Sequence, residues 1–158
     1  MNKYPLNIDC FTSEEYQLIG ISSHSKEYRL AFFINKTLGI DLRRQRDLNT
    51  SGRPTDEISP YSLFYYPEEE NDHSFYLLSN RNKKTKLIKD KDYTAIDYFF
   101  VIRRKFENSR LRELIKGLLK INLVQTAFLI EIDAIKDFLY VLTDLEEQES
   151  HFMKKSVL

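Results

Sequence analysis

The apolar positions of the chain switch between the spacing of strands and the spacing of helices. Residues 16–21 form a short apolar run that predicts a strand. Apolar residues then recur at helical spacing between Lys26 and Leu38, and Gly39 stands where a helix usually ends. We expect one of the polar residues at 22–25 to cap this helix. The sequence thus predicts a strand, a capped helix and a glycine stop in succession.

Strand patterns dominate the middle of the chain. Residues 40–48 predict a short, charged edge strand, and residues 49–59 predict a loop. A hairpin is expected over 60–80, because bulky residues alternate on both sides of an acidic turn at 68–72. Both faces of this hairpin carry bulky side chains, which is unusual for a sheet with one solvent-exposed face. The second face is therefore either covered by another element or used as an aromatic contact surface.

The last third of the chain predicts two strands and two helices. A strong strand is expected at 96–104 and a last strand at 122–132. Between them, a helix capped by Asn108 or Ser109 carries an apolar face at helical spacing. Asp133 is expected to cap a short third helix, after which the polar tail frays.

The resulting order, β-α-β-β-β-β-α-β-α, favours one α+β domain. A run of strands between two helices predicts a mostly antiparallel sheet of about five or six strands. Two main helices are expected on one face of this sheet, together with a short C-terminal helix. The domain is expected to span residues 1–143, and residues 144–158 are expected to form the frayed polar tail.

Composition narrows the class of protein. The length of 158 residues fits one domain, and 42% hydrophobic residues can supply its core. Cys10 is the only cysteine, so an internal disulfide cannot form, which is typical of the reducing cytoplasm. Neither a secretory signal nor an apolar run of about 18 residues is present, so we expect a cytoplasmic protein without a membrane span. The equal numbers of basic and acidic residues, 24 each, disfavour a protein built mainly to hold nucleic acid.

Two stretches resemble a known family. The first is IGISSHSKEYRL at 19–30, continued by NKTLGIDL at 35–42, and the second is IDYF at 96–99. Together they resemble the bacterial IPExxxVDY family over most of the chain. The IDY of the second stretch matches the end of the naming motif, whereas LIKD at 87–90 stands where LIPE is expected. The family has no established activity, so the resemblance implies a fold and a bacterial cytoplasmic protein but no chemistry.

One group of candidate binding residues lies where the first strand meets the first helix. Ser23 and His24 could form an anion site with the helix N–H groups, although capping the helix is the more common role. Asp97 and Tyr98 open a strand that looks buried, and Asp97 could act as a general base. We favour a structural ion pair between Asp97 and a nearby arginine such as Arg29. A small enzyme or ligand-binding protein would instead bring His24, Arg29 and Asp97 into one pocket.

The other candidate nucleophiles and metal ligands are poorly placed. Cys10 has no local signature of nucleophilic catalysis. His73 lies in the acidic turn, and His151 lies in the predicted tail. We therefore predict no catalytic residue, no metal site and no cofactor.

A basic connection follows the hairpin at 81–91. In a meander it lies at the opposite end of the sheet from the acidic turn at 68–72, to which residues 103–105 would return. Tyr76 and Tyr93 could stack on bases beside it, whereas zero net charge favours a simple solvated loop. The residues that would contact nucleic acid are Arg81, Lys83, Lys84 and Lys86.

Three functions are compatible with these features. We favour a non-enzymatic protein-binding or adaptor module that uses its aromatic sheet surface and forms a homodimer. An RNA-associated accessory protein that uses the basic loop at 81–91 is the alternative. A small enzyme or ligand-binding protein with a pocket near His24 is the third.

Overall fold

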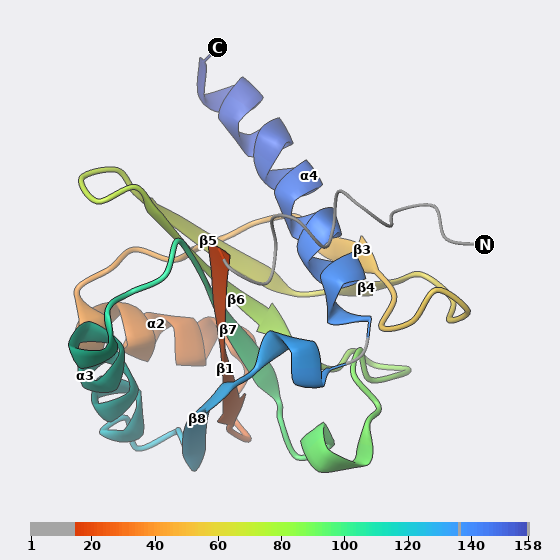
Figure 1. The fold of residues 1–158 in the computed structure, drawn as a ribbon, viewed down its shortest axis with the longest axis horizontal. Helices are drawn as coiled ribbons and strands as arrows, with labels where there is room; N and C mark the ends of the chain where they lie inside the picture. The colour runs from red at the N-terminus through yellow and green to blue at the C-terminus, as the bar shows by residue number, and fades with distance from the viewer. Residues whose placement is uncertain (1–14, 136, 158) are drawn as a thin grey trace.

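A six-stranded sheet forms the centre of the protein (Figure 1). The computed structural model describes residues 15–135 and 137–157, with side chains to residue 150. The strands lie in the order β2-β5-β6-β7-β1-β8, and every neighbouring pair is antiparallel. This is the predicted α+β domain with a mainly antiparallel sheet. The strands are β1 (Tyr16–Ser22), β2 (Arg43–Arg44), β5 (Leu63–Glu68), β6 (His73–Ser79), β7 (Tyr98–Arg103) and β8 (Thr126–Ile130).

Two helices cover one face of this sheet, as predicted. They are α2 (Glu27–Leu38) and α3 (Asn108–Leu119). Leu30 and Ile34 of α2 and Leu118 of α3 are fully buried in a cluster with Phe100 and Ile102 of β7. This burial of apolar area is the main force that holds the helices on the sheet.

The observed ends of these helices agree only in part with the ends predicted from the sequence. Gly39 has a φ of 70°, the left-handed conformation of a helix stop, as expected. The predicted caps are wrong, because the N-cap residues are Lys26 for α2 and Glu107 for α3, and neither helix has a side-chain cap. The Ser23 hydroxyl instead accepts a hydrogen bond from the N–H of Ser25 at 3.2 Å. The candidate cap thus stabilises the turn before α2.

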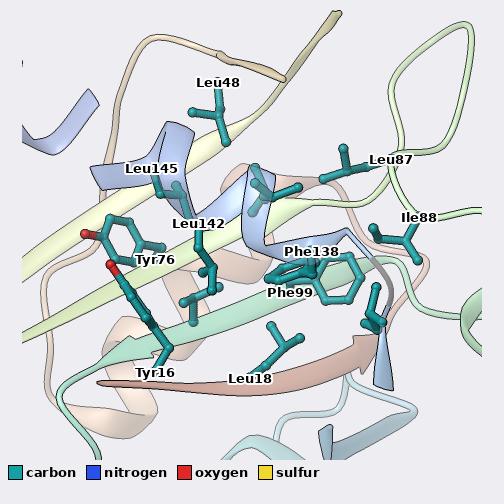
Figure 2. Packing of buried hydrophobic residues seen from close by; sticks show 14 of the residues in the cluster. Tyr16, Leu18, Leu48, Tyr76, Leu87, Ile88, Phe99, Phe138, Leu142 and Leu145 are labelled. Atoms are coloured by element: carbon teal, nitrogen blue, oxygen red, sulfur yellow. The ribbon is translucent and has the colours of Figure 1, made fainter. Parts of the chain in front are cut away.

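A third helix, α4 (Phe138–Val157), lies on the opposite face of the sheet (Figure 1). Its Leu142 and Leu145 are fully buried in the same cluster as Tyr76, and the ring of Phe138 packs edge-on against Phe99 with centroids 5.3 Å apart (Figure 2). The doubly aromatic hairpin is therefore covered on both faces. The aromatic contact surface that the sequence left open is not present.

The sequence predicted a short third helix followed by a frayed tail from residue 144, whereas the structure has one long helix, α4, in this region. This helix has 20 residues, and it continues through the segment expected to fray. Phe138, Leu142, Leu145 and Glu149 follow one another at helical spacing and are all buried. The fourth of these residues is an acid, so the sequence did not mark it as a member of a buried face.

Smaller elements complete the second layer. A two-stranded sheet pairs β3 (Leu48–Thr50) with β4 (Ser59–Tyr61), so the predicted loop at 49–59 is shorter than expected. Short 3-10 helices, η1 (Lys91–Tyr93) and η2 (Ile132–Ala134), precede β7 and α4. Among the described residues, no helix is long and apolar enough to cross a membrane.

Glu149 is a buried carboxylate between α4 and the sheet. It accepts hydrogen bonds from the Tyr65 hydroxyl at 3.0 Å, the Ser74 hydroxyl at 3.3 Å and the Tyr76 hydroxyl. Arg103 Nη1 lies 3.2 Å from the same carboxylate and balances its charge. Burial raises the pKa of Tyr76, and the negative charge of Glu149 raises it further, so the hydroxyl stays protonated as a donor. Charge and hydrogen bonds together offset the cost of burying an acid.

The ends of the meander carry the predicted charges. Arg104 Nε lies 2.9 Å from Asp72, as expected for the return of residues 103–105 to the acidic turn. Arg110 of α3, which was not part of that prediction, lies 3.4 Å from Glu68. Both contacts are partly exposed and contribute little to stability. Arg103 is the exception, because it points toward Glu149 instead.

Replacing Glu149 tests the role of this carboxylate. Glu149→Ala leaves Arg103 and three hydroxyls without their shared acceptor, so we expect unfolding to become easier by about 3 kcal/mol. Glu147→Ala on the exposed side of the same helix is the matched control and should change stability by less than about 0.5 kcal/mol. Urea denaturation followed by circular dichroism measures both. Equal effects of the two substitutions would contradict the role of Glu149.

Candidate binding cleft

A cleft of about 1140 Å³ opens at the end of the sheet opposite the acidic turn. One wall is the segment that leads into and through β4, at 55–62. The other wall is the basic connection after β6, at 81–89. The first residues of α2 close one side. The basic residues singled out in the sequence therefore line a concave site.

The tip of the basic connection is a tight hairpin. Arg81 and Lys86 pair as an isolated antiparallel bridge. Within it, the Asn82 side-chain oxygen accepts hydrogen bonds from the N–H groups of Lys84 and Thr85, both at 2.9 Å. Such bonds from an asparagine side chain fix a turn in one conformation. The backbone that carries the basic residues is thus fixed, although the side chains of Lys83 and Lys84 at the tip are exposed to solvent.

Asn82 also joins the two walls of the cleft. Its side-chain nitrogen donates to the Ser59 hydroxyl at 2.9 Å and to the carbonyl of Pro60 at 2.8 Å. A second link lies deeper, where Gly52 approaches the backbone of Leu87. A Cβ at position 52 would come 1.9 Å from the Leu87 carbonyl oxygen, so only glycine fits there. The walls therefore keep a fixed separation.

Asn80 anchors the base of the basic connection. Its side chain is fully buried, donates to the carbonyl of Ile96 at 2.8 Å and accepts from the N–H of Ile88 at 2.8 Å. The carbonyl of Asn80 also accepts from Leu87 N–H. Because both ends of the connection are bound to one buried residue, its geometry is set by the core.

Asp97 ties the cleft to the end of β1. Its carboxylate accepts the N–H of Ser23 at 2.8 Å and forms an ion pair with Arg81. The structure therefore shows the expected structural ion pair of Asp97 with an arginine, and this arginine is Arg81 rather than Arg29. Arg29 is exposed on α2. Because β6 pairs antiparallel with β7, Arg81 just after β6 lies within reach of Asp97 just before β7.

Tyr98 lines the cleft beside this ion pair. Its hydroxyl donates to the carbonyl of Ser25 at 2.5 Å, which holds the start of α2 against β7. Burial raises the pKa of Tyr98 to about 12, and the nearby Glu27 and Asp97 carboxylates contribute. The hydroxyl therefore stays protonated at neutral pH and acts as a donor.

Among the described residues, Lys26, which precedes α2, forms no ion pair with an acidic group, and the same holds for Lys83 and Lys84. Both are exposed at the hairpin tip, and within the described residues neither has an acidic group within ion-pair distance. Several other charges in the cleft are already engaged: Lys89 contacts Asp56 at 3.7 Å, and Asp47 contacts Arg44. The basic side chains that line the cleft are Lys26, Arg81, Lys83, Lys84, Lys86 and Lys89, and the acidic ones are Glu27, Asp47, Asp56 and Glu57.

His24 and Arg29 occupy a different place. They line a shallow hollow of about 470 Å³ beside the loop at 122–125, and both are exposed. Asp97 does not line that hollow. The structure thus brings Ser23, Asp97 and Tyr98 together but does not bring His24 and Arg29 to them.

The aromatic residues expected to stack on bases are not available at the cleft. Tyr76 is fully buried under α4, and Tyr93 packs against the core. The aromatic residues that do line the cleft, Tyr61 and Tyr98, are 2% and 6% exposed. The cleft therefore offers charges and hydroxyls rather than stacking surfaces.

The histidines and the cysteine considered in the sequence analysis form no second candidate site among the described residues. His73 contacts Glu68 at 3.2 Å and packs on the ring of Phe106. Cys10 lies outside the described residues, as does the side chain of His151. Within the part of the chain that the structure describes, no group of three or more metal-ligating side chains is present.

Sequence reasoning found the basic residues of the cleft but missed the asparagines that hold them. The signal for Asn82 was present, because an asparagine followed by Lys-Lys-Thr between two strands is typical of a turn. Asn80 offered no comparable signal, since its partner Ile88 lies in a segment without a regular pattern and its contact with Ile96 depends on how the strands pair. Comparison with known proteins finds no family model that matches the chain and no curated protein similar to it.

The Asn82 contacts lead to a test of the rigidity of the hairpin. Asn82→Ala removes the acceptor for two backbone N–H groups and the two hydrogen bonds that Asn82 donates to Ser59 and Pro60 of the other wall. We expect the Lys84 and Thr85 amides to exchange with solvent about tenfold faster, and stability to fall by about 1 kcal/mol. Hydrogen–deuterium exchange measures the first effect. Asn122→Ala, at an exposed position away from the hairpin, serves as the control, and unchanged exchange in the Asn82 variant would contradict the assignment.

Proposed function

We propose that this chain is a non-enzymatic protein-binding module whose cleft takes an acidic segment of a partner protein. The observation that carries the proposal is the fixed hairpin at 81–86, which presents Lys83 and Lys84 to the cleft without acidic partners among the described residues. Because the hairpin backbone is already ordered, binding there costs little backbone conformational entropy. An anionic partner could therefore form ion pairs there with only a small loss of conformational entropy in the hairpin.

The mixed charge of the cleft supports a polypeptide rather than RNA as the partner. Glu57 and Glu27 share the cleft with the lysines and would repel a phosphate backbone. A peptide can place its own amide groups or a basic residue against these acids while its carboxylates meet Lys83 and Lys84. Single-stranded RNA also needs stacking surfaces for affinity, and the tyrosines at the cleft are buried.

The proposed role is binding without catalysis, because the titratable groups are not placed to react with a ligand in the cleft. Asp97 is held by Arg81 and by the N–H of Ser23, which leaves it paired rather than facing a ligand. His24 lies in the other hollow. A binding role uses the arrangement as it is. A lone cysteine fits the reducing cytoplasm as the place where the module works.

Charge reversal at the hairpin tip tests the proposed function. A short fluorescein-labelled peptide rich in Asp and Glu should bind the wild-type protein, measured by fluorescence anisotropy, and binding should weaken as salt rises. The double variant Lys83→Glu/Lys84→Glu should weaken binding about tenfold or more, because attraction is replaced by repulsion.

The control for this experiment is Lys36→Glu/Lys120→Glu, which changes the net charge equally at exposed positions outside the cleft. It should retain most of the affinity. A labelled RNA of mixed sequence is tested in parallel. Binding of the RNA but not of the acidic peptide would overturn the proposal in favour of the RNA-associated alternative, and equal losses in both double variants would remove the cleft as the site.

A further inference from the structure

The two edges of the main sheet differ in how they are protected. The edge at β2 consists of two residues, Arg43 and Arg44, and both are exposed. Short, charged strands are a common way to prevent pairing with another chain. The edge at β8 has five residues, TAFLI at 126–130, without a charge or a proline. Within the described residues, the β2 edge therefore carries the usual protection and the β8 strand does not.

The β8 edge exposes large apolar side chains on both faces of the sheet. Phe128 is 42% exposed and Leu129 is 45% exposed. The neighbouring residues show which face each side chain occupies. Ala127 belongs to the core under α2 and α3, whereas Ile130 belongs to the core under α4. Phe128 thus flanks the edge on the α4 side, and Leu129 flanks it on the other side.

The hydrogen-bond pattern shows which backbone groups of β8 face outward. The Ile21 carbonyl accepts from Asp97 N–H on the β7 side, whereas the Ser22 carbonyl accepts from Gln125 N–H on the β8 side. By alternation the peptide groups of Gly20 also face β8, where its register partner is Phe128. The N–H and C=O groups of Ala127 and Leu129 therefore point away from β1. Among the described residues, β8 has no strand on that side.

We infer that the β8 edge pairs antiparallel with the β8 edge of a second copy of this chain, so that one continuous sheet crosses both copies. A two-fold axis at Phe128 would place Ala127 opposite Leu129 of the partner copy. The outward N–H and C=O groups of these two positions would then pair completely. The two Phe128 rings would lie side by side at a position without backbone hydrogen bonds, where cross-strand side chains approach most closely.

The sequence of the edge favours a second copy as the occupant. In this register the small Ala127 meets the large Leu129, and Thr126 meets Ile130. The first charged residue beyond the strand, Glu131, would face Gln125 rather than another acid. Like charges opposite each other, which would oppose self-pairing, do not occur. The pairing is independent of the cleft, which lies elsewhere on the protein.

Sedimentation of the full chain at rising concentrations tests this inference. The wild-type protein should shift from the monomer mass of 18.9 kDa toward twice that mass. Phe128→Lys places two positive charges against each other at the axis and should raise the dimer dissociation constant about tenfold or more. The matched control is Phe32→Lys, since Phe32 of α2 is an exposed aromatic residue of similar size. It should leave the dissociation constant unchanged.

Mixing two variants of opposite charge at position 128 distinguishes loss of edge pairing from general destabilisation of the protein by the substitution. Phe128→Glu alone should also remain monomeric, but an equal mixture of Phe128→Lys and Phe128→Glu should associate, because opposite charges then meet at the axis. Circular dichroism checks that each variant is folded. A wild-type protein that stays at 18.9 kDa at every concentration, or a mixture that does not associate, would overturn the inference.

Discussion

The Glu149 carboxylate is the point at which α4, the aromatic hairpin and β7 meet. It accepts hydrogen bonds from Tyr65, Ser74 and Tyr76, and Arg103 balances its charge. These contacts fix the position of the second half of α4, and Leu142 and Leu145 can then cover the sheet. A buried acid is costly unless every partner is in place, so the contact favours one position of the helix over others nearby.

The coverage of both faces decides where this protein can bind other molecules. With α2 and α3 on one face and α4 on the other, the large aromatic residues of the hairpin serve the core. Contact surfaces must then lie at the ends or edges of the sheet. The cleft beside the basic hairpin lies at one end, and the open β8 strand lies at one edge. The two proposals follow from this arrangement, in which helices cover both faces of the sheet and binding surfaces lie at its end and its edge.

Local patterns allowed much of the fold to be predicted. The β5–β6 hairpin, the helices on one face and the opposite charges at the ends of the meander depend on neighbours in sequence, so periodicity was sufficient. The length and burial of α4 were not predicted, because Glu149 looks like a residue of a solvated tail until its partners on β5 and β6 are known. An arginine partner for Asp97 was expected, but Arg81 was not identified as that arginine, because it comes within reach only through the pairing of β6 with β7. The bare β8 edge could not be predicted without the strand order.

Hydrogen–deuterium exchange along α4 tests the central claim most directly. The claim is that the contacts of Glu149 hold this helix on the sheet and thereby close its second face. The account predicts that amides of α4 as far as Glu149 exchange slowly, with protection approaching that of the central strand β7. Exchange of all amides from Asp144 onward at the rate of an unfolded chain would contradict it, because the aromatic face of the sheet would then be open in solution.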